Sequence, residues 1–216
     1  MSTDHILAFQ RQLESYVAEN FPKNICFSSC LISESAALIG AEVGIVKRAV
    51  PKRIQEFSTG RHCARRSLNF FGIENSEILQ GRYGEPIWPQ DFTGSITHHS
   101  GIAVAVAMPL RQGHIGIDLV DMTESLESRS DVLTNSEVKA NYGEDYKNLD
   151  LILFSMKESL IKVLSPMMQE YVEFRDIQVE CSENVWKARF KGELLVCDLY
   201  LLQHGQLAFT TAFLRG

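Results

Sequence analysis

The stretch Phe154-Ser155-Met156-Lys157-Glu158-Ser159-Leu160-Ile161-Lys162 opens a helix-forming segment. Glu158 and Lys162 are four residues apart and therefore share one face of that helix. Upstream, Gly116-Ile117-Asp118 follows an apolar run that is typical of a buried strand. Two carboxylates and a lysine that converge from a strand end and a helix are a candidate magnesium and phosphate site, which suggests phosphoryl transfer. The alternative is an ordinary exposed helix pair, worth about 0.3–0.5 kcal/mol.

The composition bounds the class of protein. With 216 residues, 45% apolar and 22% charged, the chain suits one large globular domain or two lobes. The net charge of -6 argues against a protein that coats nucleic acid. The longest apolar stretch, Gly101 to Leu110, is shorter than the roughly 20 residues of a membrane span, and Met1 to His5 lacks a charged signal-peptide head. Five cysteines without metal-binding spacing indicate free thiols, so we expect a cytoplasmic protein.

A basic segment interrupts this acidic chain. Between Lys47 and Arg66 seven lysines and arginines face the single acid Glu56. Arg61 and Arg65 are four residues apart on a predicted helix, so two guanidinium groups could clamp phosphates from one face. A solvated helix face is the alternative for such a charge run.

The remaining elements are predicted from periodicity and turn residues. A weak internal sequence similarity between Glu56-Phe57-Ser58 and Leu153-Phe154-Ser155 favours an organisation in two lobes. The expected elements are an opening helix over 6–17, a strand over Phe27–Ile32, a helix from Pro51 to about Gly72, a shaped loop over Gly81–Pro89, a hairpin of Ile102–Ala107 with Ile115–Val120, helices over Ser130–Tyr142 and Leu149–Leu164 with Pro166 ending the second, and three antiparallel strands over Trp186–Phe190, Leu194–Leu202 and Leu207–Phe213.

An ordered set of motifs resembles the 4'-phosphopantetheinyl transferases, and more closely the Sfp-type branch represented by enterobactin synthase component D. The matching region runs from about Arg53 to Lys162, half of the chain. Its blocks are Gly60-Arg61-x-x-Ala64-Arg65, Gly84-Glu85-Pro86-Ile87-Trp88-Pro89, Gly94-Ser95-Ile96-Thr97-His98, Gly116-Ile117-Asp118 and Phe154-Ser155-x-Lys157-Glu158-Ser159-x-x-Lys162.

The resemblance implies an α+β, pseudo-twofold fold of two lobes, residues 1–112 and 113–216, in one compact unit with a cleft between them. Each lobe would be a mostly antiparallel sheet with a packed long helix. The implied enzyme is a monomeric, Mg²⁺-dependent holo-carrier-protein synthase. It would move 4'-phosphopantetheine from coenzyme A to a serine of an apo peptidyl or acyl carrier protein and release adenosine 3',5'-bisphosphate. The implied pathway is siderophore or other non-ribosomal peptide biosynthesis.

The resemblance also assigns roles to residues. Mg²⁺ would be held by Asp118 and Glu158. Glu158 would take the proton of the carrier serine, directly or through a water, while Lys157 or Lys162 stabilises charge on the pyrophosphate. The nucleotide phosphates would be contacted by Arg53, Arg61, Arg65, Ser95 and His98, and the loop with Tyr83, Glu85 and Pro86 would lie along the nucleotide.

One position departs from the family pattern, which often reads Gly-Ile-Asp-x-Glu. Here the second acid is replaced by Val120, and Asp121 points to the other face of the strand. We expect water to fill the vacant metal position, with weaker Mg²⁺ binding or a different preference such as Mn²⁺. Two alternatives therefore stay open: a non-catalytic protein that binds coenzyme A or docks a carrier, and a metal-dependent phosphohydrolase that uses Asp118 and Glu158 on a small nucleotide.

Overall fold

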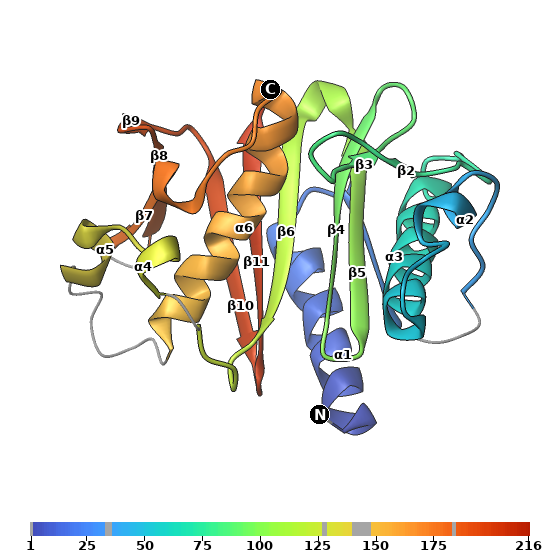
Figure 1. Cartoon of the computed structure of the whole chain (residues 1–216), viewed down its shortest axis with the longest axis horizontal. Helices are drawn as coiled ribbons and strands as arrows, with labels where there is room; N and C mark the ends of the chain where they lie inside the picture. Colours follow the sequence, from blue (N-terminus) through green and yellow to red (C-terminus); the bar gives the residue numbers. More distant parts are fainter. Residues whose placement is uncertain (1, 33–35, 127–128, 140–147, 183–184) are drawn as a thin grey trace. The chain divides into compact units, whose positions relative to one another are not determined.

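The computed structural model describes residues 2–32, 36–126, 129–139, 148–182 and 185–216. Its internal contacts divide the chain into two compact units, Met1–His114 with Gly216, and Ile115–Arg215. Each unit contains a three-stranded sheet and one long helix that packs on it (Figure 1). The fold is therefore α+β, as the sequence predicts.

Three strands and three helices build most of the first unit. The sheet has the order β1–β5–β4, and both pairings are antiparallel. A small hairpin of β2 and β3 joins the long helix α3 to β4. The elements are α1 (Thr3–Asn20), β1 (Cys26–Leu31), α2 (Glu42–Ile45), α3 (Pro51–Asn69), β2 (Leu79–Gln80), β3 (Pro86–Ile87), β4 (Phe92–His99), β5 (Ile102–Pro109) and the 3-10 helix η1 (Leu110–Gln112).

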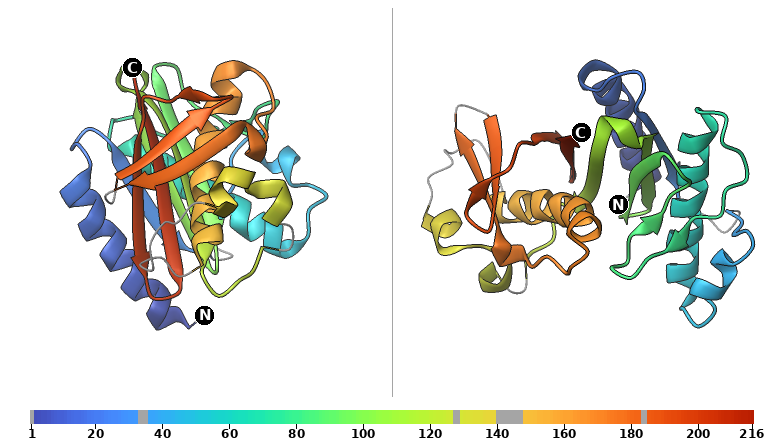
Figure 2. Two further views of the ribbon diagram at one scale, coloured as in Figure 1. Left: turned by 90° about the vertical axis from the view of Figure 1, so that its left-hand side faces the viewer. Right: turned by 90° about the horizontal axis from the view of Figure 1, so that it is seen from above.

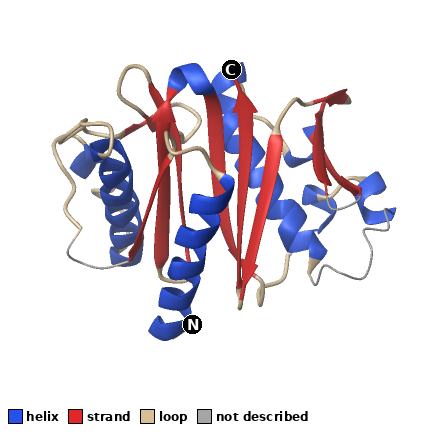
Figure 3. Cartoon of the chain, turned by 180° about the vertical axis from the view of Figure 1, so that it is seen from behind, coloured by secondary structure: helices blue, strands red, loops and turns tan. Residues whose placement is uncertain are grey.

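Strand β5 alternates alanine with branched residues, and this alternation places α3. Its small side chains, Ala103, Ala105 and Ala107, pack in one buried cluster with Cys63 and other residues of α3. Small residues on the strand let the helix lie close to the sheet. Helix α1 (Figure 3) packs at β1, where Gln10 Nε2 donates a hydrogen bond to Ser29 Oγ at 2.9 Å.

The second unit contains two sheets, with strand orders β10–β11–β6 and β7–β8–β9. The β10–β11, β7–β8 and β8–β9 pairings are antiparallel. The elements are β6 (Gly113–Asp121), α4 (Arg129–Val132), α5 (Asn135–Lys139), α6 (Leu149–Met168), the 3-10 helix η2 (Phe174–Asp176), β7 (Ile177–Ser182), β8 (Val185–Phe190), β9 (Glu193–Leu194), β10 (Asp198–His204) and β11 (Leu207–Arg215).

Helix α6 is the centre of the second unit, and Figure 2 shows the strands of that unit around it. Its apolar residues share a buried cluster with Val179 of β7, Trp186 of β8 and Ala212 of β11. Gly116 lets β6 approach the helix backbone, because a Cβ atom there would lie 1.9 Å from the carbonyl oxygen of Ser159. The glycine of the Gly-Ile-Asp motif is thus explained by packing.

Most of the predicted helices and strands are confirmed, but the hairpin of Ile102–Ala107 with Ile115–Val120 is wrong. Strand β5 pairs with β1 and β4, whereas β6 pairs with β11 in another sheet. The hairpin that forms is β4–β5, in which His99 opposes Ile102. Its two loop residues, Ser100 and Gly101, have φ values of 46° and 90°, as a tight two-residue turn requires.

Two other segments differ from the sequence-based prediction. Helix α6 continues past Pro166 to Met168, and its end is set by Gln169, which is left-handed and donates its N–H to the Ser165 carbonyl. The predicted loop Gly81–Pro89 contains β3, which pairs with β2.

Three further segments differ from the sequence-based elements. The segment Leu194–Leu202 divides into β9 and β10 in different sheets, and β7 was not predicted. The predicted helix Ser130–Tyr142 is two short helices, α4 and α5, and its last residues lie outside the described ones. Within the described ranges, no helix combines the length and hydropathy that a membrane crossing requires.

Candidate active site

Asp118 is held in place by helix α6. Lys162 Nζ donates to Asp118 Oδ1 at 2.7 Å and to the carbonyl oxygen of Ile117 at 2.9 Å. The second carboxylate oxygen, Oδ2, accepts a hydrogen bond from Ser155 Oγ at 2.9 Å. Asp118 is 7% exposed, so strand β6 and the helix meet at a largely buried ion pair. The structure thus brings Asp118 and Lys162 together, as the motif spacing predicts.

A buried hydroxyl network lies behind this ion pair. Ser155 Oγ and Ser159 Oγ lie 2.9 and 2.7 Å from Thr210 Oγ1, and Thr210 Oγ1 donates to the carbonyl oxygen of Ser155 at 2.9 Å. These contacts connect α6 to β11 at three fully buried residues. Satisfied buried networks of this kind rigidify their surroundings, so they fix the part of the helix that carries Glu158.

Glu158 lies one helical turn before Lys162 and is half-buried. Burial raises the pKa of its carboxyl group; the positive charge of Lys162 opposes this rise, and the negative charge of Asp118 adds to it. These influences require the three groups to be near one another. Glu158 therefore lies within electrostatic range of the Asp118–Lys162 ion pair, and these three residues form the carboxylate–ammonium cluster of the second unit.

Lys157 belongs to a different network. Its side chain is fully buried, and Nζ donates to Glu137 Oε2 at 2.7 Å and to the carbonyl oxygens of Val132 and Phe174 at 2.8 and 3.1 Å. Burial lowers the pKa of Lys157, and the hydrogen bond to Glu137 opposes that shift. Because these three bonds use all three N–H donors of an ammonium group, Lys157 has none left for a ligand.

Glu137 was not singled out in the sequence, although a local signal marks it. Thr134-Asn135-Ser136-Glu137 fits the capping-box pattern at the start of a helix. Glu137 Oε2 accepts from the Thr134 backbone N–H at 2.7 Å, and Oε1 accepts from the Val179 N–H at 2.7 Å. The capped helix α5 thereby presents a carboxylate to Lys157 and to strand β7.

In the first unit, Arg53 and His98 form an accessible pair. Arg53 Nη1 lies 2.9 Å from His98 Nε2, and His98 Nδ1 lies 3.8 Å from Glu56 Oε2. Arg53 is exposed in the first turn of α3, and His98 lies near the end of β4. These two side chains, to which the family resemblance assigns contacts with the nucleotide phosphates, therefore meet in the structure.

Arg61 is buried instead of exposed. It is 5% exposed, its Nε donates to the carbonyl oxygen of Ile78 at 2.6 Å, and its guanidinium carbon lies 4.2 Å from the ring centroid of Phe57. Burial lowers the pKa of Arg61 to about 10, with Glu42 opposing the shift. The side chain thus fixes the segment that leads from α3 into β2.

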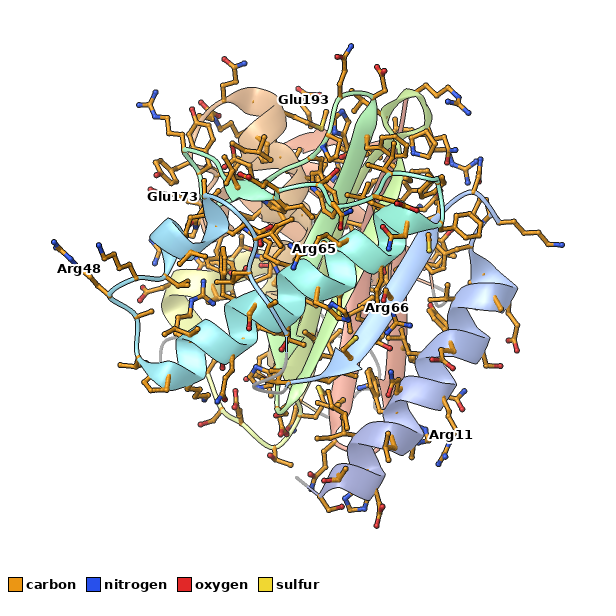
Figure 4. The ribbon with its side chains drawn as sticks, turned by 90° about the vertical axis from the view of Figure 1, so that its right-hand side faces the viewer. Arg11, Arg48, Arg65, Arg66, Glu173 and Glu193 are labelled. Carbon is orange, nitrogen blue, oxygen red and sulfur yellow. The ribbon has the colours of Figure 1, made fainter. Side chains whose placement is uncertain are left out.

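Arg65, labelled on α3 in Figure 4, also has internal partners. Its Nη1 lies 2.7 and 2.8 Å from the two carboxylate oxygens of Glu42, and Nη2 donates to the carbonyl oxygen of Ala37 at 2.6 Å. Glu42 is fully buried and also accepts the backbone N–H of Ile78 at 2.9 Å. The face that the sequence assigned to a phosphate clamp therefore already holds a carboxylate of the chain itself.

The other predicted contacts shape the backbone. Glu85 Oε2 accepts the backbone N–H of Tyr83 at 2.8 Å, and the Glu85 carbonyl accepts the N–H of Gly81 at 2.8 Å, so Glu85 closes the loop that precedes Pro86. Ser95 is 2% exposed within β4. These positions organise the loop and the strand next to Arg61 and His98.

Val120 and Asp121 behave as the strand geometry predicts. Val120 packs in an apolar cluster with Leu151 and Ala208, and Asp121 Oδ1 accepts from the N–H and hydroxyl of Thr123 at 2.9 and 2.6 Å. Neither residue supplies a further oxygen ligand to the candidate metal site at Asp118. Among the residues that the structure describes, no three His, Cys, Asp or Glu side chains form a metal-binding group. Two carboxylates still fit Mg²⁺, which usually takes its other ligands from water and substrate phosphates.

Comparison with known proteins agrees with this geometry. Residues 41–108 match the 4'-phosphopantetheinyl transferase N-terminal domain, and residues 114–212 match the 4'-phosphopantetheinyl transferase superfamily. The chain is 31% identical to 4'-phosphopantetheinyl transferase PptT of Mycobacterium tuberculosis over 169 residues, which cover 72% of this chain and 71% of the relative. It is 31% identical to 4'-phosphopantetheinyl transferase Npt of Nocardia iowensis over 164 residues, which cover 72% and 74%.

A third relative, 4'-phosphopantetheinyl transferase Svp of Streptomyces mobaraensis, is 32% identical over 165 residues, covering 74% of this chain and 66% of the relative. The matched regions include every motif block that carried the resemblance. The matched family domains, the α+β fold and the contact between Asp118 and Lys162 lead to one conclusion. The chain belongs to the 4'-phosphopantetheinyl transferase superfamily.

Proposed function

We propose that this chain transfers the 4'-phosphopantetheine group of coenzyme A to a carrier-protein serine in a Mg²⁺-dependent reaction centred on Glu158, Asp118 and Lys162. The observation that carries the proposal is the ion pair in which Lys162 Nζ lies 2.7 Å from Asp118 Oδ1, one helical turn from Glu158, whose pKa is raised by burial. This arrangement suits a reaction that needs a base and positive charge at a pyrophosphate.

Glu158 is the proposed general base. A serine hydroxyl is a weak nucleophile at neutral pH and needs a carboxylate within hydrogen-bond reach. Burial raises the pKa of Glu158, the charge of Lys162 opposes this rise, and the charge of Asp118 adds to it. A base with a pKa near the working pH combines a large deprotonated fraction with a strong drive to accept the proton.

Asp118 and Glu158 would hold Mg²⁺. When bound, the metal would neutralise charge on the pyrophosphate and polarise its oxygens. Lys162 is the lysine proposed to stabilise the developing charge, since it is part of the cluster and its side chain is 28% exposed. Lys157 is not assigned this role, because its ammonium group is enclosed by Glu137 and two carbonyl groups.

Arg53 and His98 are the proposed contacts to the nucleotide phosphates, because Arg53 is exposed and the two side chains meet. Arg61 is proposed to position the backbone at Ile78, next to the loop that would lie along the nucleotide. The phosphate contact predicted for Arg65 is not carried forward, since Glu42 occupies its guanidinium group. The contact predicted for Ser95 is likewise not pursued, since its side chain is buried in β4.

The proposed partner is an apo peptidyl or acyl carrier protein, and the proposed pathway is siderophore or related non-ribosomal peptide biosynthesis, with the enzyme acting as a monomer. The five cysteines are free thiols, which supports a reducing, cytoplasmic location.

The test is the intact mass of an apo carrier protein after incubation with this protein, coenzyme A and Mg²⁺. We expect the carrier to gain one phosphopantetheine group, to gain none in a metal-free control, and to be modified about 10²–10⁴-fold more slowly with Glu158→Gln. Bound coenzyme A without any mass gain would favour the non-catalytic alternative. Release of adenosine 3',5'-bisphosphate in the absence of a carrier would favour the phosphohydrolase.

A further inference from the structure

Two cysteine thiols meet between β1 and α3. Cys63 of α3 is fully buried, and its Sγ donates to the carbonyl oxygen of Ala103 at 3.6 Å. In the sheet, Ala103 is the β5 partner of Cys30. Cys30 packs against the same buried cluster that contains Cys63, so the two thiols are neighbours. Both sulfur atoms therefore lie close to Ala103, on the face of the sheet that α3 covers.

A guanidinium group completes this cluster. Arg66 Nη1 donates to Cys30 Sγ at 3.2 Å, and Figure 4 labels Arg66 where α3 passes β1. Arg66 is exposed and Cys30 is partly exposed, so solvent reaches the pair. The hydrogen bond from Cys63 lowers the pKa of Cys30; burial opposes this shift, and Arg66 reinforces it. The hydrogen bond with Cys30 and burial raise the pKa of Cys63.

We infer that Cys30 is the reactive thiol of this chain, a modification site for low-molecular-weight disulfides and similar electrophiles, with Cys63 as the resolving thiol. A thiolate is the nucleophilic form of cysteine, and a neighbouring cation favours it. Partial exposure gives a reagent access to Cys30, while the buried Cys63 is reached by the sulfur of Cys30.

The proposed chemistry is two thiol–disulfide exchanges. The Cys30 thiolate attacks one sulfur of the reagent disulfide, forms a mixed disulfide and releases the other half as a thiolate. Cys63 then loses its proton and attacks Cys30 Sγ, which forms the Cys30–Cys63 disulfide and releases the second half as a thiol. The reagent disulfide gains the two electrons that the two cysteines lose.

Cys26 provides a matched control. It lies four residues before Cys30 on the same strand, on the same face and with similar partial exposure. Burial raises the pKa of Cys26, with only partial opposition from the charge of Arg66. Burial also raises the pKa of Cys197, to about 11. Reaction at Cys30 and not at Cys26 would therefore report the contacts of Cys30 with Cys63 and Arg66.

The experiment treats the full chain at neutral pH with limiting oxidised glutathione and maps the products by intact mass and non-reducing peptide analysis. We expect a Cys30–Cys63 disulfide in the natural chain, and a mixed disulfide at Cys30 that persists in Cys63→Ser. Arg66→Gln should shift the rate–pH profile of the first exchange to higher pH, because loss of the guanidinium group disfavours the Cys30 thiolate. Cys26→Ser should react at the same rate as the natural chain.

Three outcomes would overturn the inference. Equal labelling of Cys26 and Cys30 would remove the special reactivity of Cys30. An unchanged rate of glutathione uptake in Cys30→Ser would place the reactive thiol elsewhere. A mixed disulfide that persists in the natural chain would exclude Cys63 as the resolving thiol. Thermal unfolding checks that Cys63→Ser is folded, and Cys63→Ala, which suits the alanine-lined site, replaces it if needed.

Discussion

Replacing Lys157 with methionine separates a structural lysine from a catalytic one. Lys157 and Glu137 are both fully buried, 2.7 Å apart. Removing one partner of such a pair leaves the other charge buried and costs about 3–5 kcal/mol. Glu137 keeps its hydrogen bonds from Thr134 and Val179, but two backbone carbonyl groups lose their donor. We therefore expect Lys157→Met to lower the free energy of unfolding by about 3–5 kcal/mol.

The assay combines thermal unfolding with the carrier-mass assay. For a chain of this length, each kcal/mol shifts Tm by about 2–4 °C, so Lys157→Met should unfold about 6–20 °C below the natural chain. At a temperature where both proteins are folded, its transfer rate should stay within a few-fold of the natural rate. The matched control is Lys162→Met, whose partly exposed side chain should cost less stability, while transfer falls on the order of 10²–10³-fold.

The reasoning is refuted by the reverse pattern. If Lys157→Met unfolds at the natural temperature but loses transfer by two orders of magnitude, then Lys157 acts in the reaction and the network around Glu137 does not stabilise the fold as argued. If Lys162→Met transfers phosphopantetheine at the rate of the natural chain, the proposed catalytic role of Lys162 is refuted.

Four other perturbations test the remaining contacts. Glu158→Gln should lower the transfer rate about 10²–10⁴-fold. It should also raise Tm at neutral pH, because folding raises the pKa of Glu158 and the charged carboxylate therefore destabilises the fold above that pKa. An unchanged Tm at both neutral and acidic pH contradicts this. In the metal-free protein, an NMR titration should give Glu158 a pKa above the ordinary glutamate range, because burial raises it, and a still higher pKa in Lys162→Met, since the charge of Lys162 lowers it; a downward move would reverse the sign. Gly116→Ala should lower the free energy of unfolding, measured in urea, by about 1–3 kcal/mol, because the new Cβ atom would collide with the carbonyl oxygen of Ser159. A smaller loss would mean that α6 can shift away from β6. Arg53→Ala should weaken coenzyme A binding in calorimetry and change stability by no more than about 0.5 kcal/mol, as for other exposed residues, and unweakened binding would exclude the proposed contact.

Local sequence patterns predicted the elements better than their pairing. The apolar spacing in 6–17 and the alternation of small and branched residues in Ile102–Ala107 are properties of short segments, and both elements are present. The choice of partner strand is not local. Along the chain, β5 is adjacent to both β4 and β6, and either could form a hairpin with it. The tight two-residue turn at Ser100-Gly101 favours the hairpin with β4.

The same division holds for the candidate site. Helical spacing was enough to place Glu158 and Lys162 on one face, and the ion pair with Asp118 follows from that face packing on β6. The partners of buried charges could not be predicted in this way. Glu42 reaches Arg65 across 23 residues of sequence, and Glu137 reaches Lys157 across 20, so only the tertiary fold reveals these pairs.

The carboxylate of Glu42 inside the predicted phosphate clamp has a consequence for ionic strength. Salt screens exposed charges strongly and buried pairs weakly. The Arg65–Glu42 pair, with side chains 12% and 0% exposed, should therefore be insensitive to added salt, whereas the exposed Arg53 should lose attraction for an anion. The steepness with which added salt weakens coenzyme A binding thus counts the arginines that meet the nucleotide, and an arginine neutralised within the fold adds nothing to that count.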